Sequence, residues 1–193
     1  MKPFYRKFWN FEQMNGSSTK ENISIFDDLK KLNWLEFTAA RKEIFMSEDG
    51  GIKYTYCIGE FARTYESIKF SNEVEYIKNQ LNKEFDCNYN VCFLNRYEDE
   101  KNSLDYHADD SPEMNPDHPI CVVSFGTARE IYWKEKGFKG KVPDDQKQKL
   151  DNGSLFIMPA GFQQKYQHKI PKCDHKCGMR ISLTYRNYKN VVE

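Results

Sequence analysis

Alternation of apolar and polar residues after Asn90 constrains the fold more than any other feature. The segments VCFLNRY, PICVVSFG, EIYWKEKG, GSLFIMP and GMRISLTYR follow this strand-like pattern, and turn-rich stretches separate them. Successive side chains of a β-strand point to opposite faces, so a period of two predicts strands. A series of short strands divided by turns indicates a mostly antiparallel β core, and a two-sheet jelly roll suits that pattern.

The N-terminal half adds helices to this core. The segment SNEVEYIKNQLNKEF can be capped by Ser71 or Asn72, and its apolar residues recur at helical spacing. A shorter helix is expected near residues 25–32. The expected fold is therefore α+β with a mainly β core, namely a jelly roll, also called a double-stranded β-helix, preceded by helices and a hairpin.

Composition limits the class of protein. The 193 residues are 39% hydrophobic and 30% charged, as in a globular domain, and no apolar run approaches a membrane span of about 20 residues. The N-terminus lacks the continuous apolar stretch of a secretory signal, so the six cysteines are expected to be reduced thiols in a cytoplasmic or nuclear protein. A formal net charge of zero means that any nucleic-acid-binding surface must be local.

The segment YHADD contains the first candidate metal ligands. His107 and Asp109 are two residues apart, so on a strand they would share a face. A third ligand from His118, His168 or His175 would complete two imidazoles and one carboxylate, the facial arrangement of non-haem Fe(II) oxygenases. The alternative is a surface turn, because isolated H-x-D sequences are common.

The last strand provides a polar face. Arg180, Ser182, Thr184 and Arg186 alternate with apolar residues in RISLTYR. Ordinary alternation with a solvated polar face is one interpretation. The other is a pocket for a small dicarboxylate, because guanidinium groups bind carboxylates through paired hydrogen bonds. The segment LNRY adds Asn95 and Tyr97 on one strand face.

Taken together, these motifs resemble the AlkB family of Fe(II)- and 2-oxoglutarate-dependent dealkylases. The N-x-Y, H-x-D, distal histidine and R-x-[NS]-x-T-x-R motifs stand in the family's order, and SFGTAREIYWK resembles a family strand. The resemblance spans about Ala40 to Asn187 and is strongest to eukaryotic homologues that repair DNA. It implies oxidative demethylation of bases such as 1-methyladenine and 3-methylcytosine in DNA or RNA, with Fe(II), 2-oxoglutarate and O₂.

The resemblance also implies residue roles. His107, Asp109 and His168 would ligate Fe(II). Arg180 would bind the distal carboxylate of 2-oxoglutarate with Tyr97 and Ser182, where Ser182 replaces the more usual Asn. Arg186 and Asn95 would hold the keto-acid end, and Thr184 would line the same site.

The substrate residues follow from the same resemblance. The segment GGIKYTYC is similar to a lid whose aromatic residues, here Tyr54 and Tyr56, close over a flipped base. The alternative for these tyrosines is cross-strand packing within a hairpin. Arg41, near the lid, and Asp110, beside Asp109, stand near positions that contact substrate in the family.

A basic segment follows the strand-like EIYWKEKG. Six lysines, including Lys134, Lys136, Lys139 and Lys141, stand against three acidic residues in WKEKGFKGKVPDDQKQK. This segment resembles a family loop that grips the opposite DNA strand, and its lysines would bind phosphates. A solvated charged hairpin is the alternative.

One domain is expected over residues 1–193. Within it we expect an N-terminal extension at 1–22, a helical layer with the nucleotide-recognition lid at 23–90, and the catalytic core at 91–190. A monomer is the expectation, although no motif fixes the oligomeric state.

Two other functions compete with base demethylation. An iron and 2-oxoglutarate hydroxylase acting on a protein side chain would need neither the lid nor the basic segment. A zinc module built on Cys173, His175 and Cys177 is the non-enzymatic alternative, but its one-residue gaps are shorter than those of common zinc motifs.

Overall fold

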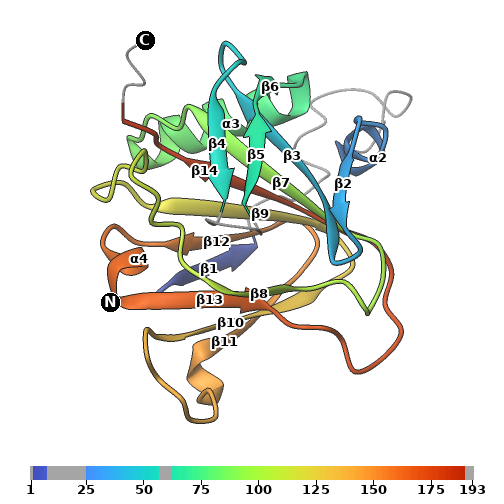
Figure 1. Cartoon of the computed structure of the whole chain (residues 1–193), viewed down its shortest axis with the longest axis vertical. Helices are drawn as coiled ribbons and strands as arrows, with labels where there is room; N and C mark the ends of the chain where they lie inside the picture. Colours follow the sequence, from blue (N-terminus) through green and yellow to red (C-terminus); the bar gives the residue numbers. More distant parts are fainter. Residues whose placement is uncertain (1, 8–24, 57–61, 190–193) are drawn as a thin grey trace.

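Two β-sheets form the body of the molecule in the computed structural model, which describes residues 2–7, 25–56 and 62–189 (Figure 1). The large sheet has the strand order β1 (Phe4–Lys7), β12 (Ser154–Met158), β9 (Ile120–Gly126), β14 (Arg180–Arg186), β7 (Val91–Tyr97), β3 (Arg41–Ser47) and β2 (Leu35–Thr38). The short strand β6 (Ile68–Lys69) pairs with β3 in parallel. Residues 8–22 of the expected N-terminal extension lie outside the described residues.

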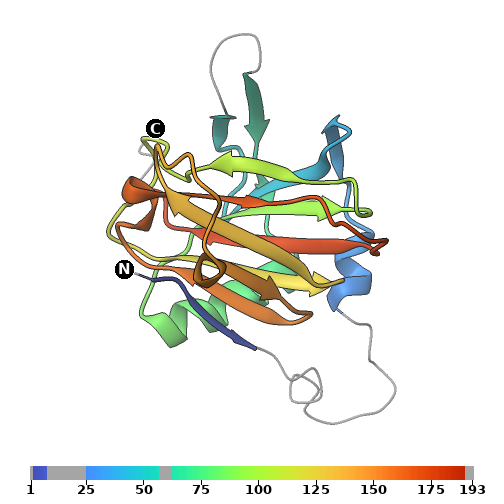
Figure 2. The same cartoon turned by 90° about the horizontal axis from the view of Figure 1, so that it is seen from below.

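The small sheet has the order β11 (Lys147–Leu150), β10 (Arg129–Glu135), β13 (Tyr166–Ile170) and β8 (Leu104–His107). A 3₁₀ turn, η2 (Asp144–Gln146), and a short helix, α4 (Phe162–Lys165), precede β11 and β13. Figure 2 shows the small sheet in front of the large one. These two facing antiparallel sheets confirm the predicted jelly roll.

A separate hairpin stands beside the sheets. It consists of β4 (Lys53–Tyr56) and β5 (Arg63–Glu66), which pair antiparallel. Its base is tied to the chain that leads into β6 by backbone hydrogen bonds between Ile52 and Ser67 and between Gly51 and Ser67. The expected lid segment is thus a hairpin.

Helix α3 (Asn72–Phe85) forms where the apolar period of the sequence predicts it. The side chain of Ser71 caps its start by accepting the amide hydrogen of Val74, and Asp86 ends it in the left-handed conformation. Leu81 and the other apolar residues of one face are buried. The shorter helix α2 (Ile25–Lys30) lies beside it and also covers the large sheet (Figure 1). Among the described residues, no helix has the length and apolar character to cross a membrane.

The large sheet has an apolar core on each face. Ile181, Leu183 and Tyr185 of β14 face the helices, where they join one cluster of buried residues. A second cluster lies between the two sheets and includes Trp133 and Ile170 of the small sheet. The alternate residues of β14 face this second side, and all seven residues of the strand are buried. The polar face of RISLTYR therefore lies inside the protein and not in solvent.

Several strands were not among the predicted segments, and composition explains three of them. Strands β8 and β13 have four and five residues, and polar side chains interrupt their alternation. Strand β3 is almost entirely buried, so its sequence RKEIFMS shows little period-two contrast.

Candidate active site

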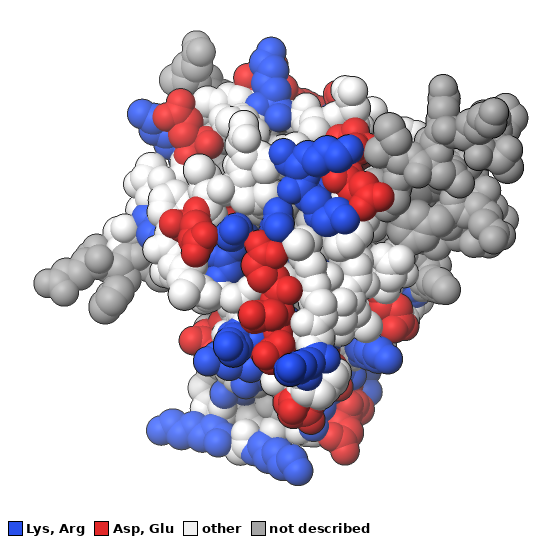
Figure 3. Space-filling view, turned by 90° about the vertical axis from the view of Figure 1, so that its right-hand side faces the viewer, with Lys and Arg blue, Asp and Glu red and all other residues white. Residues whose placement is uncertain are grey.

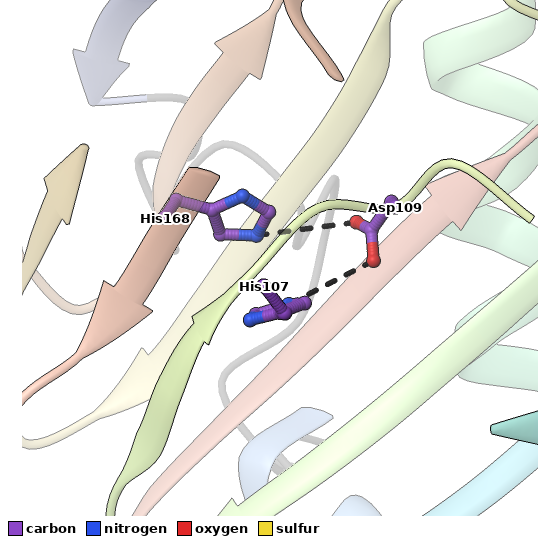
Figure 4. Close-up of side chains that lie close together, drawn as sticks. All are labelled: His107, Asp109 and His168. Atoms are coloured by element: carbon purple, nitrogen blue, oxygen red, sulfur yellow. Dashed lines mark ion pairs between the residues drawn. The ribbon is translucent and has the colours of Figure 1, made fainter. Parts of the chain in front are cut away.

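Two histidines and one aspartate meet between the sheets (Figure 4). His107 ends β8 and lies opposite His168 of β13 in the ladder, so their rings are 4.2 Å apart. The Asp109 carboxylate lies 3.8 Å from His107 Nε2 and 4.0 Å from His168 Nε2. Among the described residues, this is the one group of three or more potential ligands whose donor atoms lie within 4.8 Å of one another.

The strand geometry of these ligands differs from the prediction in one respect. Strand β8 ends at His107, so Asp109 lies in the following loop rather than on the same strand. His168 lies in β13, which α4 precedes. Cross-strand pairing of the histidines and the turn of the loop bring the three side chains together instead.

Neighbouring groups orient the three ligands. His107 Nδ1 lies 2.9 Å from the carbonyl oxygen of Asp105, which favours a proton on Nδ1 and leaves Nε2 free to bind a metal. The Asp109 amide donates to the Gln163 side chain at 3.0 Å, and Arg186 donates to the Asp109 carboxylate at 2.7 Å. Backbone, amide and guanidinium contacts therefore hold the cluster in place.

Burial sets the protonation states of the cluster. It lowers the pKa of His168 to about 3, with a further contribution from His107, and it also lowers the pKa of His107. Burial alone would raise the pKa of Asp109, but Arg186 and the two imidazoles outweigh it and lower this pKa. Near pH 7 the cluster therefore presents two neutral imidazoles and one carboxylate, the forms that ligate metals.

The cluster fits a divalent iron ion. Asp109 Oδ2 is buried and has no hydrogen-bond donor among the described residues. A buried carboxylate oxygen without a partner is costly, and a cation would satisfy it. Two nitrogens and one carboxylate on one side of a metal are typical of non-haem Fe(II) sites.

The three ligands line a cavity between the two sheets, and residues of strands β7 and β14 line one end of it. Arg180 is fully buried, and one of its nitrogens donates to Ser124 Oγ at 2.9 Å. Its Nε and Nη1 have no acceptor among the described residues, and burial lowers its pKa to about 10 despite the opposing effect of Tyr97. A buried guanidinium with two free nitrogens fits a carboxylate, as the dicarboxylate interpretation predicts.

The other predicted co-substrate residues line the same cavity: Asn95, Tyr97, Ser182, Thr184 and Arg186. The ring of Tyr97 lies under the Arg180 guanidinium, 5.3 Å from its carbon, and Asn95 is the direct cross-strand neighbour of Ser182. We call this part of the cavity the co-substrate end.

The side of the cavity that the hairpin forms, which we call the substrate end after the predicted substrate residues, is lined by Tyr54 and Tyr56, and Arg41 of β3 lines the same cavity beside Asn95. The ring of Tyr54 packs against Phe45 and Phe93 at centroid distances of 6.0 and 6.3 Å. Arg41 Nε donates to the Asn95 side chain at 2.8 Å. The hairpin tyrosines therefore pack against the core and also border the cavity.

The basic segment lies away from this cavity, in the turn between β10 and β11. Lys136, Lys139 and Lys141 are exposed, whereas Lys134 is half-buried and donates to the Phe138 carbonyl. Asp110 does not line the cavity, and its carboxylate pairs with Lys136 at 2.7 Å. On the face in Figure 3 basic and acidic side chains are interspersed, consistent with the zero net charge.

The cysteine-rich loop between β13 and β14 does not form a second metal-ligand set. Cys173 and Cys177 are free thiols with sulfur atoms 3.2 Å apart. His175 turns instead to Asp174, with its Nδ1 2.6 Å from the carboxylate. The structure therefore gives no support to the zinc module.

Sequence reasoning missed two side chains of the site. Glu43 is fully buried, lines the cavity and faces Arg41. Glu43 stands two residues after Arg41, and residues at this spacing on a strand share a face, so the spacing could have identified it. Gln163, which binds the Asp109 amide, comes from a distant helix and has no sequence signature.

Known proteins are similar to this chain in sequence and in fold. A family model described as the 2OG-Fe(II) oxygenase superfamily matches residues 41–186. Alpha-ketoglutarate-dependent dioxygenase alkB homolog 3 of Bos taurus is 30% identical over 86% of this chain and 62% of its own length. The human DNA oxidative demethylase ALKBH2 is 28% identical over 72% of this chain and 53% of its own length.

A structural relative has the same fold. The solved structure of OsALKBH1 superposes with a TM-score of 0.50 at 17% identity, covering 77% of this chain and 78% of that one. The chain spans less than two thirds of the length of the two sequence relatives named above. By its family match and its motifs, the chain belongs to the 2OG-Fe(II) oxygenase superfamily and is similar to the AlkB homologs within it.

Proposed function

We propose that this protein oxidatively removes methyl groups from N-alkylated bases, of the 1-methyladenine and 3-methylcytosine type, in DNA or RNA. One observation carries the proposal: a single cavity contains the His107, Asp109 and His168 cluster, the buried guanidinium of Arg180 and an aromatic hairpin. Its relatives include proteins named as DNA oxidative demethylases, in agreement with this activity.

The three ligands and the co-substrate end define the oxidative half of the site. His107, Asp109 and His168 would hold Fe(II), and Arg180 would bind the distal carboxylate of 2-oxoglutarate beside Tyr97 and Ser182. Bound Fe(II) and 2-oxoglutarate supply the oxidation: O₂ and 2-oxoglutarate give succinate and CO₂, and the methyl carbon leaves as formaldehyde. The apolar part of the lining, which includes Val122, Ile131 and Ile170, would limit the access of water to the reacting atoms.

Arg186 also contacts one of the three predicted metal ligands. Its guanidinium already pairs with the Asp109 carboxylate, and each group shifts the pKa of the other towards the charged form. Arg186 therefore keeps Asp109 ionised and oriented, and with Asn95 it would hold the keto-acid end of 2-oxoglutarate.

The substrate end would receive the damaged base. Tyr54 and Tyr56 border the cavity from the hairpin and would stack on a flipped base. Arg41 lines the same cavity. The exposed lysines of the β10–β11 turn and Asp110 lie outside the cavity. The lysines would grip the phosphates of the opposite DNA strand, and Asp110 would contact the substrate.

We propose that the chain is divided in the way its sequence predicts. Residues 91–190 would supply the catalytic core and residues 23–90 the helical layer and lid, with an extension at 1–22. The protein would act as a monomer on nucleic acid in the cytoplasm or nucleus.

The test is incubation of the protein with Fe(II), 2-oxoglutarate and oligonucleotides that contain 1-methyladenine or 3-methylcytosine. Single-stranded DNA, double-stranded DNA and RNA form separate arms, and mass spectrometry measures the product. We expect a loss of about 14 Da per lesion, one CH₂ unit, in at least one arm. Succinate formation with no mass loss in any arm would instead favour the protein hydroxylase.

A further inference from the structure

At its base the hairpin that borders the substrate end continues into β6, which pairs with β3 of the large sheet. Beyond this base it contacts the large sheet through side chains. Among the described residues, β4 and β5 form ladders only with each other. Tyr54 and Tyr65 are cross-strand neighbours on the hairpin face that lines the cavity. Contacts made by this face therefore determine where Tyr54 stands relative to the cavity.

Glu43 is the polar centre of those contacts. Its side chain is fully buried, and its Oε2 accepts a hydrogen bond of 2.8 Å from the Tyr65 hydroxyl. Arg63, also on β5, donates to the same oxygen at 3.3 Å. The other oxygen pairs with Arg41. One carboxylate thus joins two residues of the hairpin to the large sheet.

The position of Glu43 in the sheet relates it to the co-substrate end. Glu43 is the direct cross-strand neighbour of Asn95, which is in turn the neighbour of Ser182. Arg41, its ion-pair partner, donates to the Asn95 side chain. A continuous polar row therefore runs from the hairpin contact towards the residues of the co-substrate end.

The hydrogen bond between Glu43 and Tyr65 holds the ring against which Tyr54 packs. The ring of Tyr65 is buried and stacks on Tyr54 at a centroid distance of 6.2 Å, and it meets Phe93 edge-on at 5.0 Å. Burial and the Glu43 charge raise the pKa of Tyr65, so its hydroxyl stays protonated and remains a donor. A hydrogen bond to a charged acceptor inside a protein is stronger than a neutral one.

We propose that Glu43 is a positioning residue that anchors the hairpin through Tyr65 and Arg63 and thereby places Tyr54 for stacking on the substrate base. This role rests on the proposed demethylase function. Glu43 would act through its partners and would not touch the reacting atoms. Its loss should weaken substrate capture while 2-oxoglutarate binding stays nearly unchanged.

The main test uses Tyr65→Phe, which removes the hydroxyl and keeps the stacked ring. We expect the KM for a methylated oligonucleotide to rise about tenfold, as for removal of a hydrogen bond to a charged group. The KM for 2-oxoglutarate and the kcat should stay within about twofold of the wild-type values. The matched control is Thr64→Val, the neighbouring residue on β5, whose exposed hydroxyl meets Thr55 and not Glu43. It should behave as the wild type.

Variants of Glu43 extend the test. Glu43→Ala should raise the oligonucleotide KM more than Glu43→Gln, because glutamine can still accept from Tyr65. Combining Glu43→Ala with Tyr65→Phe should add nothing to Glu43→Ala, since both changes break the same contact. Fluorescence anisotropy of a methylated oligonucleotide on iron-free protein should show the same order of affinities without any turnover.

The outcomes separate this inference from the proposed function. A wild-type protein that demethylates, with Tyr65→Phe and Thr64→Val equal to it in oligonucleotide KM and affinity, would overturn the role of Glu43 alone. Equal increases in both KM values for Tyr65→Phe would also overturn it, because they indicate a general structural defect. A wild-type protein that leaves every methylated oligonucleotide unchanged would refute the demethylase function itself.

Discussion

The two ends of the cavity are held in different ways. The co-substrate end lies on β14, which pairs with β7 on one side and β9 on the other along most of its length. The substrate end depends on a two-stranded hairpin whose attachment to the sheet rests on Glu43 and a group of aromatic rings. Backbone hydrogen bonds fix the first end, whereas at the second end they hold only the base of the hairpin and side-chain contacts hold the rest.

Because of this difference, the oxidative part of the site is rigidly held, whereas the part that would recognise substrate can be adjusted. A residue of a strand that is paired on both sides cannot move without breaking ladders on both sides, which suits a co-substrate that never changes. A hairpin held by a few side chains can be altered by single substitutions while the oxidative site stays intact. Changes at the two ends should therefore affect different kinetic constants.

Removing a predicted metal ligand should have the largest effect. We expect His107→Ala to abolish both succinate formation and oligonucleotide demethylation, because only two ligands would remain. Iron content after anaerobic loading, measured by elemental analysis, should fall in parallel. His175→Ala is the matched control, since His175 is exposed and pairs with Asp174, and it should keep full activity. Full activity of His107→Ala would exclude the proposed iron site.

Arg180→Met should act on the co-substrate end alone. Losing a buried charged partner costs about 2–5 kcal/mol, so the KM for 2-oxoglutarate should rise by about 30-fold or more. Arg180→Lys should recover little, because lysine lacks the two-pronged geometry. The oligonucleotide affinity of iron-free protein, measured by anisotropy, should not change. A normal KM for 2-oxoglutarate in Arg180→Met would mean that its carboxylate binds elsewhere.

Tyr54→Ala should act on the substrate end alone. Stacking of a base on an aromatic ring contributes about 1–3 kcal/mol, so the oligonucleotide KM should rise by between about 5-fold and 150-fold. Tyr54→Phe keeps the ring and should remain near the wild type. Succinate formed without oligonucleotide should be equal in all three proteins. An unchanged KM in Tyr54→Ala would show that Tyr54 serves only hairpin packing.

Neutralising the lysines of the basic turn should have the smallest effect per residue on oligonucleotide affinity. Replacing Lys136, Lys139 and Lys141 with glutamine removes up to three positive charges that would bind phosphates. The slope of log affinity against log salt concentration should then fall by about 1 for each phosphate that is no longer neutralised. The KM for 2-oxoglutarate should be unaffected. An unchanged salt slope would support a solvated hairpin that does not touch nucleic acid.

The same contrast explains what the sequence could predict. The shared face of Arg180, Ser182 and Arg186 was predictable, because they alternate along one strand and strand periodicity alone places them together. The metal cluster needed the family resemblance, because pairing of β8 with β13 is a long-range contact that no local pattern encodes. Gln163 reaches Asp109 from a distant helix, so only the folded structure could reveal this contact.

The sequence predicted where the hairpin lies along the chain but not how it is attached to the large sheet. Its tyrosines stand in a clear strand-turn-strand sequence. Glu43 appeared to be one more charged residue of a strand, because nothing in the sequence shows that β5 returns to place Tyr65 against it. Side-chain anchors between separate sheets are set by tertiary packing, beyond the reach of periodicity.

The stoichiometry of the reaction tests the central claim most directly, namely that one cavity joins 2-oxoglutarate oxidation to base demethylation. Succinate and demethylated base can be measured in the same sample by mass spectrometry, with His107→Ala as the blank. We predict about one succinate for each methyl group removed when the methylated oligonucleotide is saturating. Succinate that forms at the same rate with and without the oligonucleotide, with no demethylated base, would contradict the account.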